Sequence, residues 1–382
     1  MSQFYDDAFA TASYAIGADT QHIADQLRKL RYPIETRELM SQWSLAPAFN
    51  GLGLPGRYQP LRQTTLNFQT ISLCARYELY EKIGFISPTL LFSPPGPGMA
   101  AFAVAGLGTA QQQDAFFSRF QQELCWSCFA MTEPAQGSDA GAMQTTATAV
   151  EGGFLISGEK MFIGNGMIAD TGVLFARTAP GPLGINAFVF NPQRREITRR
   201  ALDLAGLEGI NLAQMRFDNL FIPNGDLLGR HLKPTQRFAR SAMATFDALR
   251  PCVGALALGV ARRALHEWQT ALVPTQSQSQ RLSRTHLRWH AAYRNALQTC
   301  RQIEGKQAPD ENPGMVKTTC VILAEEIISM LIHNLPEEIS PLHTTLWRAF
   351  RDVKAFEYTE GTRQIHRLNQ GFSADQGKCE CR

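Results

Sequence analysis

Strand-like runs occupy only the middle third of the chain, and this confinement limits the possible fold more than any other feature. Between Cys125 and Gly229, short β-rich runs alternate with turn signals such as Gly152-Gly153 and Asn224-Gly225. The runs cover residues 145–150, 153–157, 172–177, 187–191 and 214–222. Because no helical pattern separates them, they predict a small barrel or sandwich and not a Rossmann unit.

Helical periodicity fills both flanks of this β-rich region. From about Asp19 to Gln122, apolar residues such as Ile23, Leu27 and Leu30 recur at helical spacing. The pattern returns near Thr235, with long amphipathic segments over 253–268 and 315–334. We therefore expect an α+β multi-domain protein: an N-terminal α-helical domain over 1–124, a middle β-domain over 125–232, and a C-terminal α-helical bundle over 233–382.

Composition excludes several classes of protein. The chain has 382 residues, 44% of them apolar, and a formal net charge of only +3, so it can bury a large core and lacks the basic excess of a nucleic-acid binder. Its longest apolar run, Val253 to Ala261, is far shorter than the roughly 18 residues that suggest a membrane span. Residues 1–25 show no secretory signal. We expect a cytoplasmic protein that binds neither nucleic acid nor membrane.

The cysteines do not indicate a metal site. Cys125 and Cys128 form a CxxC pair, but no second pair of ligands at matching spacing accompanies them. A redox dithiol usually opens a helix, whereas the surrounding residues 124–131 have the pattern of a buried strand. We expect core thiols, and we assign no role to Cys379 and Cys381 in the tail.

Three motifs carry a specific resemblance. They are TEPAQGSD at residues 132–139, GEKMFIGNG at 158–166 and YTEGTRQIHR at 358–367. In this order, and with helices on both sides of a β-region, they resemble the flavin-dependent acyl-CoA dehydrogenase family. The resemblance is strongest over 125–268 and 351–368. It implies FAD as cofactor and an acyl thioester as substrate, carried by CoA or by an acyl carrier protein.

The first two motifs are suited to a flavin. Small hydroxyl residues and glycine on a loop after a buried strand let backbone amides approach a planar, acceptor-rich ring closely, although an ordinary polar turn has the same composition. The resemblance places these residues at the cofactor: Phe129, Met131, Thr132, Ser138, Phe162, Ile163, Gly164, Thr362 and Gln364. It places Ser138 at the acyl carrier as well.

Gly164 departs from the family pattern. The family usually has a Thr at this position, and its hydroxyl bonds flavin N5. With glycine the flavin loses one hydrogen bond, worth about 0.5–1.5 kcal/mol, or takes it from water.

Glu360 matches the position of the family's catalytic base. That base removes the proton alpha to the thioester while a hydride passes from the beta carbon to flavin N5, and a carboxylate does this best when burial raises its pKa. The resemblance assigns Ser138, Phe246, Asp247, Arg250 and Gly361 to substrate binding. The plainer alternatives are an exposed Glu at a helix end, an Arg250 that reaches solvent, and a Phe246 that belongs to the core.

Two elements of the family that contact the flavin nucleotide are absent. Residues 273–280 replace an Arg-x-x-Phe-Gly turn that reaches a neighbouring subunit's diphosphate, and residues 333–338 replace a Gly-Gly loop near the adenine. Glu337 and Glu338 are poor neighbours for a diphosphate. We therefore expect weak retention of FAD and a homodimer rather than the family's tetramer.

A basic stretch of the chain does not distinguish between CoA and a carrier protein as the acyl carrier. From Arg230 to Lys306 there are 13 Lys or Arg residues against three acidic ones, which suits CoA phosphates or an acidic carrier protein, but also an ordinary solvated face. Our first hypothesis is a flavin-dependent acyl-thioester dehydrogenase. The alternatives are a redox-free thioester isomerase or dehydratase that uses the same base, and a non-catalytic partner subunit in a hetero-oligomer. The acyl chain and the electron acceptor are not encoded in any recognisable motif.

Overall fold

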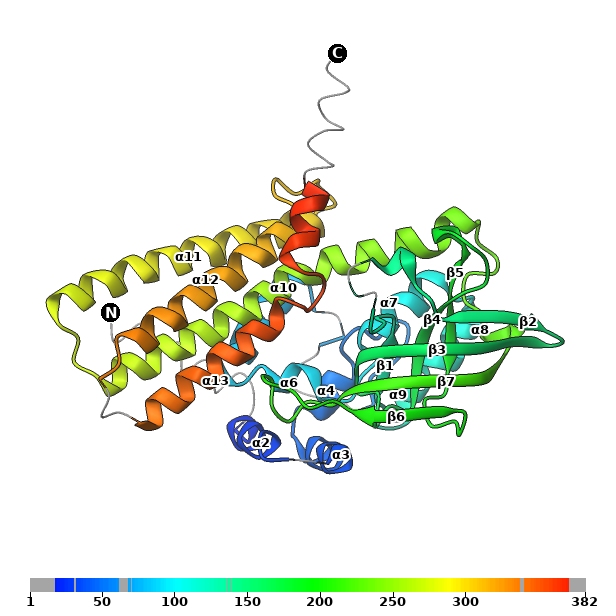
Figure 1. The fold of residues 1–382 in the computed structure, drawn as a ribbon, viewed down its shortest axis with the longest axis horizontal. Coiled ribbons are helices and arrows are strands. Elements are labelled where there is room, and N and C mark those ends of the chain that lie inside the picture. Colours follow the sequence, from blue (N-terminus) through cyan, green and yellow to red (C-terminus); the bar gives the residue numbers. More distant parts are fainter. Residues whose placement is uncertain are drawn as a thin grey trace, which may run out of the picture.

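The computed structural model describes residues 18–30, 32–61, 68–69, 71–135, 137, 139–336 and 340–370. A bundle of long helices lies beside a curled β-sheet, and shorter helices pack around both (Figure 1). The order of helices, then strands, then helices confirms the predicted fold class. Where the chain divides into domains stays a prediction.

The N-terminal part consists of short helices. Ser72 and Thr109 cap two of them with side-chain oxygens that accept backbone N–H groups of Ala75 and Gln112. The helices are α2 (Thr20–Leu27), α3 (Pro33–Gln42), α4 (Ala46–Asn50), α5 (Leu73–Ile86), α6 (Thr89–Phe92), α7 (Gly98–Leu107), α8 (Ala110–Phe117) and α9 (Arg119–Gln122).

The middle part is a seven-stranded sheet with the order β1-β4-β2-β3-β7-β6, to which β5 adds by pairing with β4. The strands are β1 (Ser127–Ala130), β2 (Thr146–Val150), β3 (Gly153–Gly164), β4 (Thr171–Arg177), β5 (Ile185–Phe190), β6 (Ile197–Ala201) and β7 (Leu212–Pro223). β1 runs parallel to β4, and β3 runs antiparallel to β7 with register shifts before Gly158 and Ile163. β3 therefore extends to Gly164, beyond the predicted end at Ser157, and carries the second motif.

The C-terminal part is a bundle of α10 (Pro234–Ala271), α11 (Gln276–Glu304), α12 (Pro313–His333) and α13 (Ser340–Phe356), followed by a helical segment over 363–370. α10 packs against α5, α12 and α13. Gly84 and Gly259 allow α5 and α10 to meet at backbone distance, because a Cβ at Gly84 would lie 2.2 Å from the Leu256 carbonyl oxygen. The apolar face of α12 is buried within this chain.

No described helix is both long and apolar enough to cross a membrane, and this part of the chain holds no cluster of three or more His, Cys, Asp or Glu side chains suited to a metal ion. Cys125 and Cys128 are buried, and burial raises the pKa of the Cys125 thiol to about 12. Both are core thiols, as expected; Cys379 and Cys381 lie outside the described residues.

Candidate active site

Glu360 lies in a tight turn between α13 and the helical segment 363–370. Its φ is +58°, and that of Gly361 is +100°, so two successive residues adopt the left-handed region. Such a conformation is unfavourable for a residue with a Cβ and persists only where surrounding contacts impose it. Gly361 also needs to be small, because a Cβ there would lie 3.0 Å from Cε1 of His366.

Two buried cations hold the carbonyl oxygens of this turn. Lys317 of α12 donates from Nζ to the carbonyl oxygens of Glu357, at 3.1 Å, and Gly361, at 2.6 Å. Arg250 of α10 donates from Nε to the carbonyl oxygen of Glu360 at 3.2 Å. Both side chains are buried, so the conformation of the turn is set by groups on two other helices.

The carboxyl group of Glu360 differs from its backbone in its hydrogen bonding. Its Oε2 atom is buried and has no hydrogen-bond partner among the described residues. Burial raises the pKa of Glu360 from 4.5 to about 7, although the positive charges of Arg250 and Lys317 act in the opposite direction. Glu360 as a whole is half-buried. A carboxyl group with one buried, unbonded oxygen and a pKa close to neutral is suited to accepting a proton from a bound molecule.

Neighbouring polar groups complete the turn without engaging that carboxyl group. Glu357 accepts the Arg363 backbone N–H at 2.8 Å and pairs with the Arg363 guanidinium at 2.9 Å. The buried ring of His366 lies against Gly314 and Gly361. Burial lowers the pKa of His366 to about 4, so its ring is neutral at pH 7.

A second group of residues predicted from sequence lies on and beside the sheet. Phe162 is 57% exposed and also has a left-handed φ, of +59°. A large apolar ring presented to the outside in a strained conformation is a candidate contact for a planar ligand. Next to it, the Met161 backbone N–H donates to the carbonyl oxygen of Thr132 at 2.9 Å. This bond joins the first two motifs.

A buried ion pair fixes the first motif beneath this surface. Lys160 donates from Nζ to the Met131 carbonyl oxygen and to Oε1 of Glu133, both at 2.9 Å. Glu133 also accepts hydrogen bonds from Thr145 and Gln144. Burial alone would raise the pKa of Glu133, but these hydrogen bonds and the charge of Lys160 outweigh it and lower the pKa. Because all the polar groups are satisfied, the pair can hold the loop rigidly.

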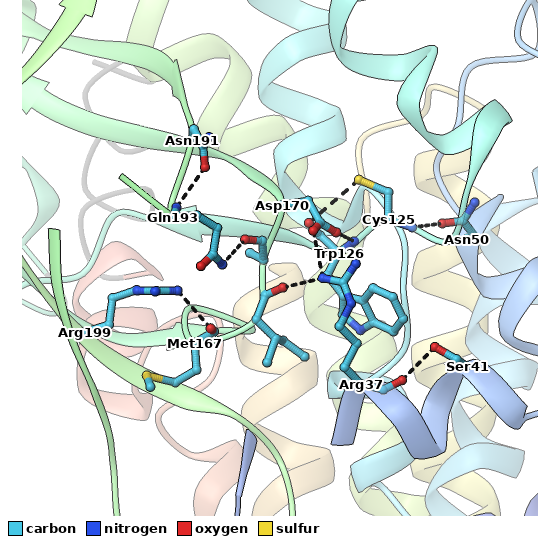
Figure 2. A network of polar contacts seen from close by, with 12 residues as sticks. Arg37, Ser41, Asn50, Cys125, Trp126, Met167, Asp170, Asn191, Gln193 and Arg199 are labelled. Carbon is cyan, nitrogen blue, oxygen red and sulfur yellow. Dashed lines mark hydrogen bonds and ion pairs between the residues drawn. The ribbon is translucent and has the colours of Figure 1, made fainter. Parts of the chain in front are cut away.

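The turn after Gly164 is held by side chains from three directions (Figure 2). Arg37 of α3 donates to the Ile168 carbonyl oxygen at 2.9 Å and pairs with Asp170 at 2.8 Å, while its guanidinium stacks 4.5 Å from the centre of the Trp126 ring. Asp170 in turn accepts the Trp126 backbone N–H at 2.9 Å. Gln193 and Arg199 donate to the carbonyl oxygens of residues 169 and 167. Residues 162–164 therefore precede a well-anchored turn.

The residues predicted from sequence form two groups. On the sheet, Thr132 and Phe129 are half-buried, Met131 is buried, and Gly164 has open space where a Cβ would point. The Ile163 side chain packs into the sheet core, so only its backbone can meet a ligand. On the bundle, Arg250, Glu360 and Gly361 come together, Thr362 is half-buried and Gln364 is exposed.

Four predicted substrate residues need separate comment. Phe246 is half-buried, with the Arg250 guanidinium 5.8 Å from its ring centre. Arg250 does not reach solvent, contrary to the plainer alternative. Ser138 and the Asp247 side chain lie outside the described residues, as do Glu337 and Glu338.

Lys317 was missed by the sequence reasoning, although a signal was present. It shares a helix face with Cys320, Ala324, Ile327 and Leu331, all of which are buried. A lysine at a core position of an amphipathic helix must find acceptors inside the protein. That requirement marks it as a candidate for a specific contact.

Comparisons with known proteins identify the family of this chain. Residues 128–220 match the acyl-CoA dehydrogenase middle domain, and residues 239–371 match the acyl-CoA dehydrogenase C-terminal domain. Together these matches span more than half of the chain, and the chain belongs to the acyl-CoA dehydrogenase family. The family recognised from the three motifs is confirmed.

Individual relatives are more distant. An acyl-CoA dehydrogenase of Bacillus subtilis is 42% identical over 141 residues, which span 36% of this chain and only 36% of that protein. The structure of butyryl-CoA dehydrogenase from Megasphaera elsdenii superposes with a TM-score of 0.75 at 21% identity, covering 98% of this chain and 97% of that one. A structure described as the FAD complex of PigA has a TM-score of 0.75 at 20% identity and covers 96% and 95% of the two chains.

Proposed function

We propose that this protein binds FAD and oxidises an acyl thioester to its α,β-unsaturated form, with Glu360 as the base that removes the alpha proton. The observation that carries the proposal is the buried, unbonded Oε2 of Glu360 on a turn whose backbone is held by Arg250 and Lys317. Membership of a flavoprotein family supports FAD as the cofactor.

The residues on the sheet are compatible with a flavin ring. Phe162 offers an exposed aromatic face, and the open space at Gly164 leaves room for a ring edge. Thr132, whose carbonyl oxygen accepts the Met161 N–H, offers a hydroxyl. We assign the ring to these residues together with Phe129 and the backbone of Ile163, and Thr362 and Gln364 to contacts from the bundle. When bound, FAD supplies the hydride acceptor that the protein itself lacks.

Glu360 has the properties of a base that works near neutral pH. With a pKa of about 7 it is partly ionised there, and its conjugate acid is stable enough to keep a proton taken from carbon. Because Arg250 and Lys317 bond to the backbone and leave the carboxyl group free, Glu360 can turn toward a substrate without breaking its support. Gly361 lets a thioester approach the backbone closely, where an N–H can stabilise the enolate oxygen.

The test is Glu360→Gln, with Glu326→Gln on the exposed side of α12 as a matched control. We expect anaerobic acyl-CoA thioesters from butyryl to palmitoyl to bleach the flavin of the wild type and the control. In Glu360→Gln, bleaching should fall by about 10²–10⁴-fold, while FAD content and the spectral shift on thioester binding remain. Bleaching of this variant at the wild-type rate contradicts the proposal.

An acyl carrier protein is the alternative to CoA as the carrier of the acyl group. Arg281, Arg284, Arg288 and Arg294 are exposed on α11, and they would attract an acidic carrier. The same acyl group presented on CoA and on an acyl carrier protein distinguishes the two. A higher kcat/KM for the carrier-bound form, lost at high salt, supports the carrier; equal or lower values support CoA.

A further inference from the structure

We propose that Lys317 is the positioning residue of the base: through its two backbone hydrogen bonds it sets the turn that aims Glu360. This inference rests on the proposed function of Glu360 and assigns a role to a residue that none of the three motifs contains. Lys317 touches no reacting atom, so it acts only through the turn.

The first argument is geometric. The carbonyl oxygens that Lys317 joins belong to Glu357 and Gly361, the first and last residues of the turn, at 3.1 and 2.6 Å from one nitrogen atom. One ammonium group therefore bonds the first and the last residue of the turn and holds its two ends together. Glu360 lies inside it, and its left-handed φ of +58° is imposed rather than intrinsic.

The second argument concerns cost. Lys317 is 1% exposed, and both of its described contacts are carbonyl oxygens rather than a carboxylate. Burying an ammonium group destabilises a fold, and an apolar side chain at this core position of α12 would destabilise it less. What the ammonium provides in return is a fixed turn, and Arg250 adds one further bond at the Glu360 carbonyl oxygen.

The third argument is electrostatic. The positive charge of Lys317 favours the ionised form of Glu360, so its removal raises the pKa of Glu360. The other charged or titratable groups around the turn are Arg250 from α10, Tyr80 from α5, Glu325 from α12, Glu357 and Tyr358 in the turn, and Arg363 and His366 in the segment 363–370. The Lys317 charge also lowers the pKa of His366, so its removal moves the pKa values of His366 and Glu360 in the same, upward direction. Burial lowers the pKa of Lys317 itself to about 8, so the shift of the midpoint is compared below that pH.

The experiment compares Lys317→Met and Lys317→Arg in the full-length, FAD-loaded protein. Flavin bleaching by the acyl-CoA that reduces the wild type fastest is measured from pH 5.5 to 9. For Lys317→Met we expect the maximal rate per bound FAD to fall at least about tenfold, and the midpoint of its pH profile to move upward. The thioester dissociation constant should change by less than about threefold. Lys317→Arg, which keeps charge and donors, should retain the wild-type midpoint and more of the rate.

A matched control removes a different buried cation from the same bundle. Arg262 pairs with Glu81 at 2.6 Å, and the double variant Arg262→Met with Glu81→Met leaves no unpaired charge. It should alter stability but keep the rate per bound FAD and the midpoint.

Two failures are distinguishable. A wild-type rate and midpoint in Lys317→Met, beside an inactive Glu360→Gln, overturns the role of Lys317 alone. Wild-type bleaching in Glu360→Gln overturns the proposed function itself. If Lys317→Met does not fold, the test is made with Lys317→Arg. A tenfold loss of rate together with a displaced midpoint in this variant contradicts the proposal, because arginine keeps the charge and the donors. A wild-type rate and midpoint support it.

Discussion

Arg250 donates its Nε–H to the backbone carbonyl oxygen of Glu360 at 3.2 Å, and it does not bond the carboxyl oxygen Oε2 of the same residue. The hydrogen-bond partner of Arg250 affects the pKa and the availability of the Glu360 carboxyl group. An ion pair between the two side chains would lower the pKa of the carboxyl group and occupy its lone pairs. A bond to the backbone fixes the residue while leaving its carboxyl group available to a substrate.

The rate of flavin reduction should rise with pH through about 7. Burial raises the pKa of Glu360 to about 7, and only the ionised carboxylate can accept a proton. Stopped-flow reduction from pH 5.5 to 9 with a saturating acyl-CoA gives the profile. A rate that is flat across this range would assign the proton transfer to another group.

Glu360→Gln should stabilise the fold at pH 8 more than at pH 5. The folded pKa of Glu360, about 7, exceeds the ordinary value of 4.5, so the folded state holds its proton more tightly than the unfolded state. The associated stability is fully present below pH 4.5 and is lost as pH rises through 7. At about 1.36 kcal/mol per pKa unit, the upper limit is about 3 kcal/mol. Thermal denaturation of both proteins at the two pH values measures the difference, and an equal effect at both would show an unperturbed carboxyl group.

Gly164→Thr should tighten FAD binding and shift the flavin potential. A Cβ at Gly164 meets no atom within 4 Å, so the side chain fits, and its hydroxyl can supply the hydrogen bond worth about 0.5–1.5 kcal/mol. The expected gain is a two- to tenfold lower FAD dissociation constant, roughly. Gly164→Val is the control because it has the same shape without the hydroxyl. If valine tightens binding equally, packing and not the hydrogen bond is responsible.

FAD should leave the protein on dialysis at high salt. The turn between α10 and α11 exposes Val273 by 96% and contains neither the Phe nor the Gly that the family uses toward a diphosphate. We therefore expect fewer protein contacts at the nucleotide end of FAD than at its ring. Flavin absorbance per protein before and after dialysis tests this, and stoichiometric retention would mean that other residues hold the diphosphate.

We also expect a homodimer in solution. Residues 273–280 replace the family's turn that reaches a neighbouring subunit, and residues 333–338 replace its Gly-Gly loop near the adenine, so we expect fewer of the contacts that build the tetramer. The apolar face of α12 does not require a second copy, because it is buried in its own chain. Light scattering of the purified protein measures the mass; a tetramer would show that other surfaces substitute for these contacts.

The sequence by itself determined the order of helices and strands, because apolar spacing reports directly on the local period of the backbone. It also predicted Glu360, Phe162 and Gly164 as site residues through motifs that are contiguous in the chain. It ended β3 too early, since Gly158, Glu159 and Lys160 resemble a turn. In the structure Lys160 is buried because Glu133, 27 residues earlier, supplies its partner, and the strand continues.

Only the tertiary structure decided how Glu360 is held. The bonds from Lys317 to Gly361 and from Arg250 to Glu360 join residues 44 and 110 positions apart. No local pattern encodes such contacts, because they depend on how α10 and α12 pack against the end of α13. The left-handed φ of Glu360 has the same origin: the isolated chain disfavours it, and the packed helices impose it.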